Sequence, residues 1–129
     1  MAFVRFVIQT NDPNSGRRQG LFQALAELEE RGVLRPHERR TCAQAYEWFR
    51  RNLRKPRSFA RSSKPRAKNV AVSWFKDTAL RHIQRMWAIA EILKAHGIAV
   101  QMIRTDRPGY VVYEDEYQVT AEPFGDTGA

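Results

Sequence analysis

The alternation of apolar and polar positions divides the chain into eight predicted elements. The first of them is rich in β-branched and aromatic residues and stops at a dense cluster of turn-forming residues at 11–16. Three later segments repeat apolar residues at steps of three and four, which is typical of one face of an α-helix. The predicted strands are 3–10, 70–75, 99–104, 110–113 and 117–121, and the predicted helices are 17–31, 36–55 and 78–96.

Residues with strong backbone preferences mark the ends of these helices. Gly32 and Gly97 each follow an apolar-periodic run, where glycine readily adopts the left-handed conformation that ends a helix. Pro36 suits the first position of the second helix, because the N–H that proline lacks would have no partner there. Asp77 is the expected N-cap of the third helix.

The third predicted helix has the widest apolar stripe. The stripe consists of Leu80, Ile83, Met86, Trp87, Ala90 and Leu93, broadened by Ile89 and Ile92. Such a width predicts that this helix is the central helix of the core. The second helix has a narrower stripe and a cationic outer surface; its apolar residues are Cys42, Ala45, Tyr46, Phe49 and Leu53.

The element order β-α-α-β-α-β-β-β predicts an α+β fold with three helices and a mixed sheet of about four to five strands. The central strand, helix and strand fit a right-handed parallel crossover, and the last three strands fit a C-terminal antiparallel meander. With 129 residues, of which 43% are hydrophobic, the chain is expected to form a single domain over residues 1–122. Residues 55–68 lack apolar periodicity and predict a mobile basic loop, and residues 123–129 predict a flexible tail.

Basic residues are concentrated between positions 35 and 68. This segment holds twelve of the 22 Lys and Arg residues and only two acids, Glu38 and Glu47, so its formal charge is +10. The other 95 residues hold ten basic and twelve acidic side chains and sum to −2. Clustered cations gain from phosphate neutralisation and counterion release, whereas scattered charge mainly aids solubility. The clustering therefore favours a polyanionic partner.

The second helix and the loop after it form the candidate binding surface. Its residues are Arg39, Arg40, Arg50, Arg51, Arg54, Lys55, Arg57, Arg61, Lys64, Arg66, Lys68 and Trp48. Arginine makes bidentate contacts with phosphate, and an exposed Trp48 would offer an aromatic face to a base. The leading interpretation is a small binding protein that contacts nucleic acid, DNA or RNA, through this surface. The alternative is a protein-interaction or inhibitor module whose basic face binds an acidic protein. A basic face that is solvated and binds no partner is also consistent with the charge pattern.

Acidic residues gather in the C-terminal third of the chain, at Glu114, Asp115 and Glu116, with Asp106 nearby. Grouped carboxylates can hold Mg²⁺ for phosphodiester hydrolysis, so a metal-dependent nuclease is the third interpretation. Gln118, however, stands where such sites usually place a lysine, and alternation along a strand would send neighbouring acids in different directions. A solvated acidic hairpin is the simpler explanation, and we expect no catalytic residue, no metal and no cofactor.

The histidines and the single cysteine predict structural roles. His37, His82 and His96 lie on separate segments without the spacing of metal ligands. Cys42 falls on the apolar stripe of the second helix, where a small buried residue is usual.

The cellular location is expected to be the cytoplasm. A single cysteine excludes an intramolecular disulfide, and no apolar run of signal-peptide length follows Met1. The longest apolar stretch, residues 86–93, is interrupted by Glu91 and is far shorter than the ~20 residues that span a bilayer. We therefore expect no membrane partner, and the sequence does not define an oligomeric state.

Four segments are the most distinctive, and they read GLFQALAELEERG, YEWFRRNL, SWFKDTALRHIQRMWAIAEILKAHG and RPGYVVYEDEYQVTAEPF. Together they resemble a group of small uncharacterised bacterial single-domain proteins. The resemblance covers nearly the whole chain. It implies a bacterial single-domain protein and carries no activity or functional residue over to this chain.

Overall fold

The computed structural model describes residues 1–11, 18–55, 71–125 and 127–128. Its elements in chain order are β1 (Phe3–Asn11), β2 (Arg18–Gly20), α1 (Leu21–Glu30), α2 (Pro36–Asn52), β3 (Val72–Lys76), α4 (Leu80–Ala95), β4 (Gln101–Thr105), β5 (Tyr110–Glu114) and β6 (Gln118–Glu122). The predicted α+β class and the predicted succession of strands and helices are confirmed, with β2 as an additional strand of three residues.

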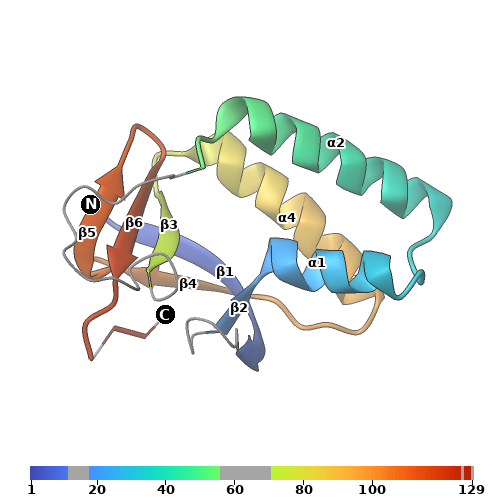
Figure 1. The fold of residues 1–129 in the computed structure, drawn as a ribbon, viewed down its shortest axis with the longest axis horizontal. Coiled ribbons are helices and arrows are strands. Elements are labelled where there is room, and N and C mark those ends of the chain that lie inside the picture. Colours follow the sequence, from blue (N-terminus) through green and yellow to red (C-terminus); the bar gives the residue numbers. More distant parts are fainter. Residues whose placement is uncertain (12–17, 56–70, 126, 129) are drawn as a thin grey trace.

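β1 organises the sheet (Figure 1). Phe3 pairs with both Lys76 of β3 and Thr105 of β4, so β3 and β4 lie on opposite edges of β1. Further along β1, β2 pairs on the same edge as β3, and β3 continues the sheet through β6 to β5. All strand pairs among the described residues are antiparallel, in contrast to the expected mixed sheet. β3 and β4 are parallel to each other as the crossover prediction requires, but β1 lies between them.

The C-terminal strands do not form the predicted three-strand meander. β5 and β6 form the expected antiparallel hairpin, with Tyr110 opposite Glu122. β4 instead pairs with β1 over five positions, from Phe3 opposite Thr105 to Val7 opposite Gln101. This register buries Ile103 on one face of the sheet and packs Met102 against the helices on the other, because successive strand residues point to opposite faces.

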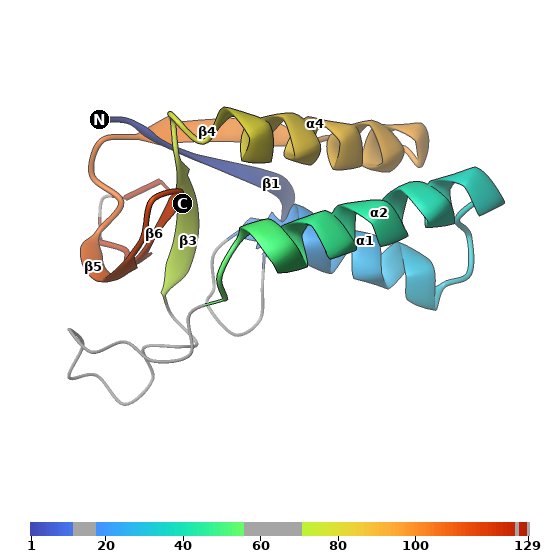
Figure 2. The same cartoon turned by 90° about the horizontal axis from the view of Figure 1, so that it is seen from above.

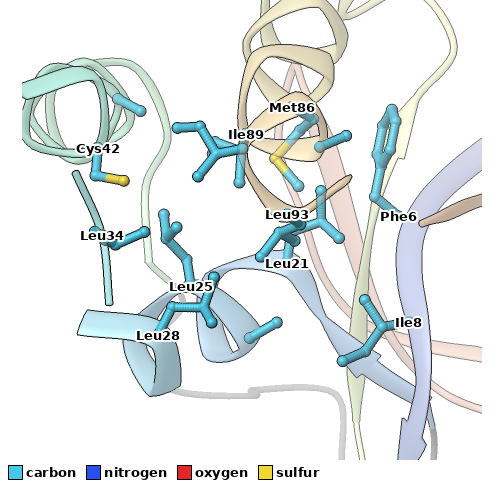
Figure 3. Packing of buried hydrophobic residues seen from close by; sticks show 14 of the residues in the cluster. Phe6, Ile8, Leu21, Leu25, Leu28, Leu34, Cys42, Met86, Ile89 and Leu93 are labelled. Atoms are coloured by element: carbon cyan, nitrogen blue, oxygen red, sulfur yellow. The ribbon is translucent and has the colours of Figure 1, made fainter. Parts of the chain in front are cut away.

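The three described helices lie together, and the end of α2 and the start of α4 contact β3, where Phe75 packs against Phe49 and His82 (Figures 1 and 2). Their apolar faces enclose the larger core cluster, in which Leu21 and Leu25 of α1 meet Ile89 and Leu93 of α4, with Phe6 contributed by β1 (Figure 3). These five side chains are almost completely buried. Burial of this apolar surface is the main favourable contribution to folding.

A smaller apolar cluster covers the other face of the sheet. It contains Val7 of β1, Trp74 of β3, Ile103 of β4 and Val119 of β6. The sheet therefore carries apolar residues on both faces, with the helices on one side and the smaller cluster on the other.

Glycine ends two helices as predicted. Gly32 follows α1 with φ of 68°, and Gly97 follows α4 with φ of 77°. The prediction of Asp77 as N-cap is wrong, because α4 begins after Ala79 and no side chain caps it. No helix in the described part of the chain is long and apolar enough to cross a membrane.

The wide stripe of α4 is only partly in the core. Met86, Ala90 and Leu93 are buried as predicted, but Leu80 is 65% exposed and Trp87 is 43% exposed. The buried side of α4 faces α1 and α2, whereas the Trp87 ring lies edge-on to Phe6 of β1, with 4.9 Å between ring centroids. An apolar arc wider than the covered face therefore leaves two large side chains in contact with solvent.

The described C-terminal residues lie against the β4–β5 connection. Thr127 is buried, and its hydroxyl donates a hydrogen bond to the carbonyl of Arg107 at 3.3 Å. The Arg107 guanidinium also lies over the Phe124 ring. These contacts place residues of the predicted tail on the surface of the domain.

Candidate nucleic-acid interface

Glu38 fixes the N-terminal end of α2. Its Oε1 accepts a hydrogen bond from the backbone N–H of Arg35 at 2.8 Å and lies 2.9 Å from Nε2 of His96, at the C-terminal end of α4. The Arg35 N–H and His96 together lower the pKa of Glu38. Glu38, one of the two acids in the basic segment, is thus a buried structural group. Its contact with His96 links α2 to α4.

The C-terminal end of α2 is held by two further contacts. Nε2 of His82, on α4, lies 2.8 Å from the carbonyl oxygen of Asn52. The Gln118 side chain, on β6, donates to the carbonyl of Arg54 at 2.5 Å. Because His82 and Gln118 are both buried, the backbone beneath Arg51 and Arg54 has a defined position.

Trp48 is partly exposed beside the start of α4. Its ring meets Phe49 edge-on at 5.1 Å and His82 at 4.8 Å between centroids. Two guanidinium groups from α4 lie over it, Arg85 at 5.1 Å and Arg81 at 5.8 Å from the ring centroid. The indole and the two arginines therefore form a cation–π cluster that joins two helices.

The four candidate arginines of α2 do not form an uninterrupted cationic face. Glu47 lies among them and makes ion pairs of 2.7 Å with Arg50 and with Arg51. Hydrogen bonding from Arg50, together with both positive charges, lowers the pKa of Glu47 against the effect of desolvation. Arg39 and Arg40 lie eleven residues before Arg50 and Arg51, about 16 Å away along the helix.

The remaining candidates continue past the helix. Arg54 and Lys55 are exposed just after the end of α2. The other five, Arg57, Arg61, Lys64, Arg66 and Lys68, lie outside the described residues.

We call Trp48, Arg51, Arg81 and Arg85 the α2–α4 basic surface. Arg51 lies one turn beyond Trp48 on α2 and is exposed, as are Arg81 and Arg85. Neither α4 arginine has an ion pair with an acid among the described residues. The sequence prediction missed both α4 arginines because they lie outside the segment of highest charge. Their i, i+4 spacing is the signal that could have identified a second cationic ridge.

The acidic hairpin is held together by its own hydrogen bonds. Asp115 accepts the Tyr113 hydroxyl at 2.8 Å, the backbone N–H of Tyr117 at 2.9 Å and the N–H of Gln118 at 3.1 Å. Glu114 forms a 2.8 Å ion pair with Lys76. No group of three or more potential metal ligands occurs among the described residues. Asp115 thus closes the β5–β6 turn and Glu114 ties the hairpin to β3.

We expect the stabilising effect of Asp115 to depend on pH. Burial raises its pKa, but the hydrogen bonds from Tyr117 and Gln118 outweigh this effect, so its pKa in the folded protein lies below the usual value. Its contribution is therefore complete above the unfolded pKa of about 3.9 and decreases as the pH falls through the folded value. Asp115→Ala should reduce the free energy of unfolding by roughly 1–3 kcal/mol at pH 7 and by less at pH 3, measured by urea unfolding.

Asp115→Asn is the matched control for this prediction. The asparagine amide keeps an oxygen that can accept hydrogen bonds from the backbone, although it carries no charge. The variant should therefore reduce the free energy of unfolding at pH 7 by less than Asp115→Ala does. If Asp115→Ala lowers the free energy of unfolding equally at pH 7 and pH 3, the assigned role of the ionised carboxylate is contradicted.

Cys42 has the environment of a core residue. It is 2% exposed, and burial, with smaller effects from Glu29 and Glu38, raises its pKa to about 11. The thiolate is therefore scarce at neutral pH, which opposes nucleophilic chemistry.

Fold and surface together define a small α+β domain with a basic, aromatic surface across two helices. Comparison with protein-family models, with curated proteins and with solved structures gives no match to this chain.

Proposed function

We propose that this protein binds nucleic acid, with low sequence preference, through the α2–α4 basic surface. The observation that carries the proposal is the placement of Arg81 and Arg85 over the ring of Trp48. The surface joins cationic groups to an aromatic plane, which are the two components of sequence-independent nucleic-acid contacts.

The first supporting argument concerns conformational entropy. A free arginine side chain has many rotamers, and ordering it on binding opposes affinity. Contact with Trp48 already restricts Arg81 and Arg85, and the ring itself packs against Phe49 and His82. The guanidinium groups can therefore donate to phosphate oxygens with a smaller ordering cost.

The second argument concerns the charge balance of the surface. Arg51 shares Glu47 with Arg50, and exposed pairs of this kind contribute only ~0–1 kcal/mol to stability, so a phosphate can replace the carboxylate. Arg81 and Arg85 have no such competitor among the described acids. A polyanion would therefore meet net positive charge on both helices.

The third argument favours nucleic acid over an acidic protein. Carboxylates on a protein surface require only cations, whereas an exposed base can also stack on a tryptophan ring or an arginine plane. Trp48 packs against the edge of the core cluster and is partly exposed, so the surface offers this second contact. The acidic-protein alternative predicts that Trp48 contributes little to binding.

Salt dependence tests the proposal. If about four phosphates are neutralised, log K should fall with log salt at a slope of about −3 to −4, for a fluorescein-labelled 15-mer of single-stranded or duplex DNA followed by anisotropy. Poly-glutamate of equal charge serves as the competitor that represents an acidic protein. No binding in 20 mM salt, or more efficient displacement by poly-glutamate than by unlabelled DNA, would overturn the proposal.

A further inference from the structure

A second exposed aromatic ring lies beside the α2–α4 basic surface. Tyr117, in the connection between β5 and β6, is 37% exposed, and its ring lies 4.4 Å from that of the buried His82, between centroids. The same His82 ring contacts Trp48, which lies 4.8 Å away. Trp48 and Tyr117 are thus both partly exposed and are separated by a single buried ring. In Figure 1, the β5–β6 connection lies near the start of α4.

Backbone hydrogen bonds fix the position of Tyr117. Its N–H donates to Oδ1 of Asp115 at 2.9 Å, and its carbonyl accepts from the N–H of Lys76, on β3, at 2.8 Å. The ring is therefore held in place before any ligand binds, and a ligand that stacks on it meets a small ordering cost. One of the hairpin acids thus helps to present an aromatic ring beside the two helices.

A groove of about 480 Å³ separates the end of α2 from the β5–β6 connection. The end of α2 and the residues after it contribute Arg50, Arg51 and Arg54 to its lining, and the hairpin contributes Tyr113 and Tyr117. Arg54 interacts with the Tyr113 hydroxyl, so cations and aromatic rings meet in one groove. Its volume is within the range of small-molecule sites in proteins, and an unpaired nucleobase can therefore enter it.

The two acids that line this groove differ in their availability to a ligand. The Asp115 carboxylate already accepts hydrogen bonds from Tyr113, Tyr117 and Gln118 within the turn. Glu116 is exposed and forms no ion pair with a cation among the described residues. A carboxylate repels phosphate but accepts hydrogen bonds from the amino groups on base edges. We therefore expect phosphates on the arginine side of the groove and bases on the hairpin side.

We propose that this surface prefers single-stranded nucleic acid to duplex, an inference that rests on the proposed function. The phosphates of the strand lie along the arginines of α2 and α4, and its unpaired bases stack on Tyr117 and on the cation–π cluster of Trp48. In a duplex, each base is stacked between its neighbours and paired at its edge, so only the phosphates can contact the same surface. The pairing state of the ligand should therefore determine its affinity.

Comparison of a fluorescein-labelled 15-mer DNA single strand with its duplex tests this preference. A duplex has the higher charge density, so a cationic surface without stacking would favour it. With stacking, the single strand should bind at least about tenfold more tightly in anisotropy titrations at one salt concentration. Equal binding, or tighter binding of the duplex, would refute the single-strand preference and leave the proposed function intact. If neither ligand binds, both are refuted.

Substitution of Tyr117 tests the contribution of its ring. Tyr117→Leu keeps an apolar side chain against His82 and should weaken single-strand binding about tenfold, while duplex binding changes by less than about twofold. Tyr117→Phe keeps the ring and should bind as the unaltered protein does. Tyr110→Leu is the matched control, since Tyr110 is an exposed tyrosine at the start of β5, away from the β5–β6 connection. Equal weakening of single-strand binding by Tyr117→Leu and Tyr110→Leu would refute the site.

A photochemical cross-link locates the bases without any substitution, so this readout does not depend on the folding of a variant. A 15-mer single strand that carries 5-iodouracil forms adducts under ultraviolet light with aromatic side chains that stack on the modified base. Mass spectrometry then identifies the residue that carries the adduct. We expect adducts at Tyr117 or Trp48. Adducts confined to other residues, such as Tyr110 or Phe124, would refute the proposal.

Discussion

Reversing the charge of Arg81 and Arg85 should reduce nucleic-acid affinity at least about 100-fold at low salt. Each guanidinium is expected to donate to a phosphate, and hydrogen bonds to charged groups contribute ~1.5–3 kcal/mol each, so loss of two corresponds to roughly two to four orders of magnitude. Arg81→Glu/Arg85→Glu should also make the slope of log K against log salt less negative by nearly two. The free energy of unfolding should fall by no more than about 1–2 kcal/mol, because the variant loses two exposed cation–π contacts with Trp48.

The matched control is Arg31→Glu/Arg104→Glu, which changes the net charge equally. Both residues are exposed, Arg31 just after α1 and Arg104 on β4, and neither belongs to the α2–α4 basic surface. We expect its affinity to fall less than tenfold. If the two double variants lose affinity equally, net charge alone governs binding and the specific surface is refuted.

Local features of the fold could be predicted because they are encoded locally. The 3.6-residue period identified the three helices of the described residues, and Gly32 and Gly97 marked two of their ends because only glycine adopts a positive φ at little cost. The β5–β6 hairpin followed from two alternating segments joined by a short acidic turn. Each of these signals lies within a few residues of the structure that it specifies.

Partners distant in sequence could not be predicted in the same way. The pairing of β4 with β1 joins residues about 100 positions apart, and no local pattern distinguishes it from pairing with β5. Similarly, an apolar stripe shows which side of α4 is apolar but not how much of that side α1 and α2 cover. Leu80 and Trp87 were therefore assigned to the core although both are exposed.

In the candidate site, too, local features could be predicted from the sequence and long-range contacts could not. Charge density directed attention to α2 and the residues just after it, where Arg50, Arg51 and Arg54 are exposed. Charge density could not show that Glu47 forms ion pairs with Arg50 and Arg51. Nor could it show that Trp48 makes cation–π contacts with Arg81 and Arg85, which lie 33 and 37 residues later in the sequence. Whether a charged side chain is available to a partner depends on three-dimensional neighbours.

Gly109 should be the most sensitive backbone position in the hairpin region. Its φ of 132° lies where side-chain-bearing residues are strained, and a Cβ atom there would overlap the backbone carbonyl of Glu122. Relief would require separation of β5 from β6 at their first pair, Tyr110 opposite Glu122. Gly109→Ala should therefore lower the free energy of unfolding by about 3 kcal/mol or more, measured by urea or thermal unfolding.

Gly125→Ala distinguishes this packing effect from the general cost of replacing a glycine. Gly125 lies three residues beyond β6, has no positive φ, and has open space where a Cβ would stand. Its substitution should change the free energy of unfolding by less than about 0.5 kcal/mol, in either direction. If Gly109→Ala proves as mild as Gly125→Ala, the close approach of the β4–β5 connection to Glu122 is wrong, and with it the described end of the β5–β6 hairpin.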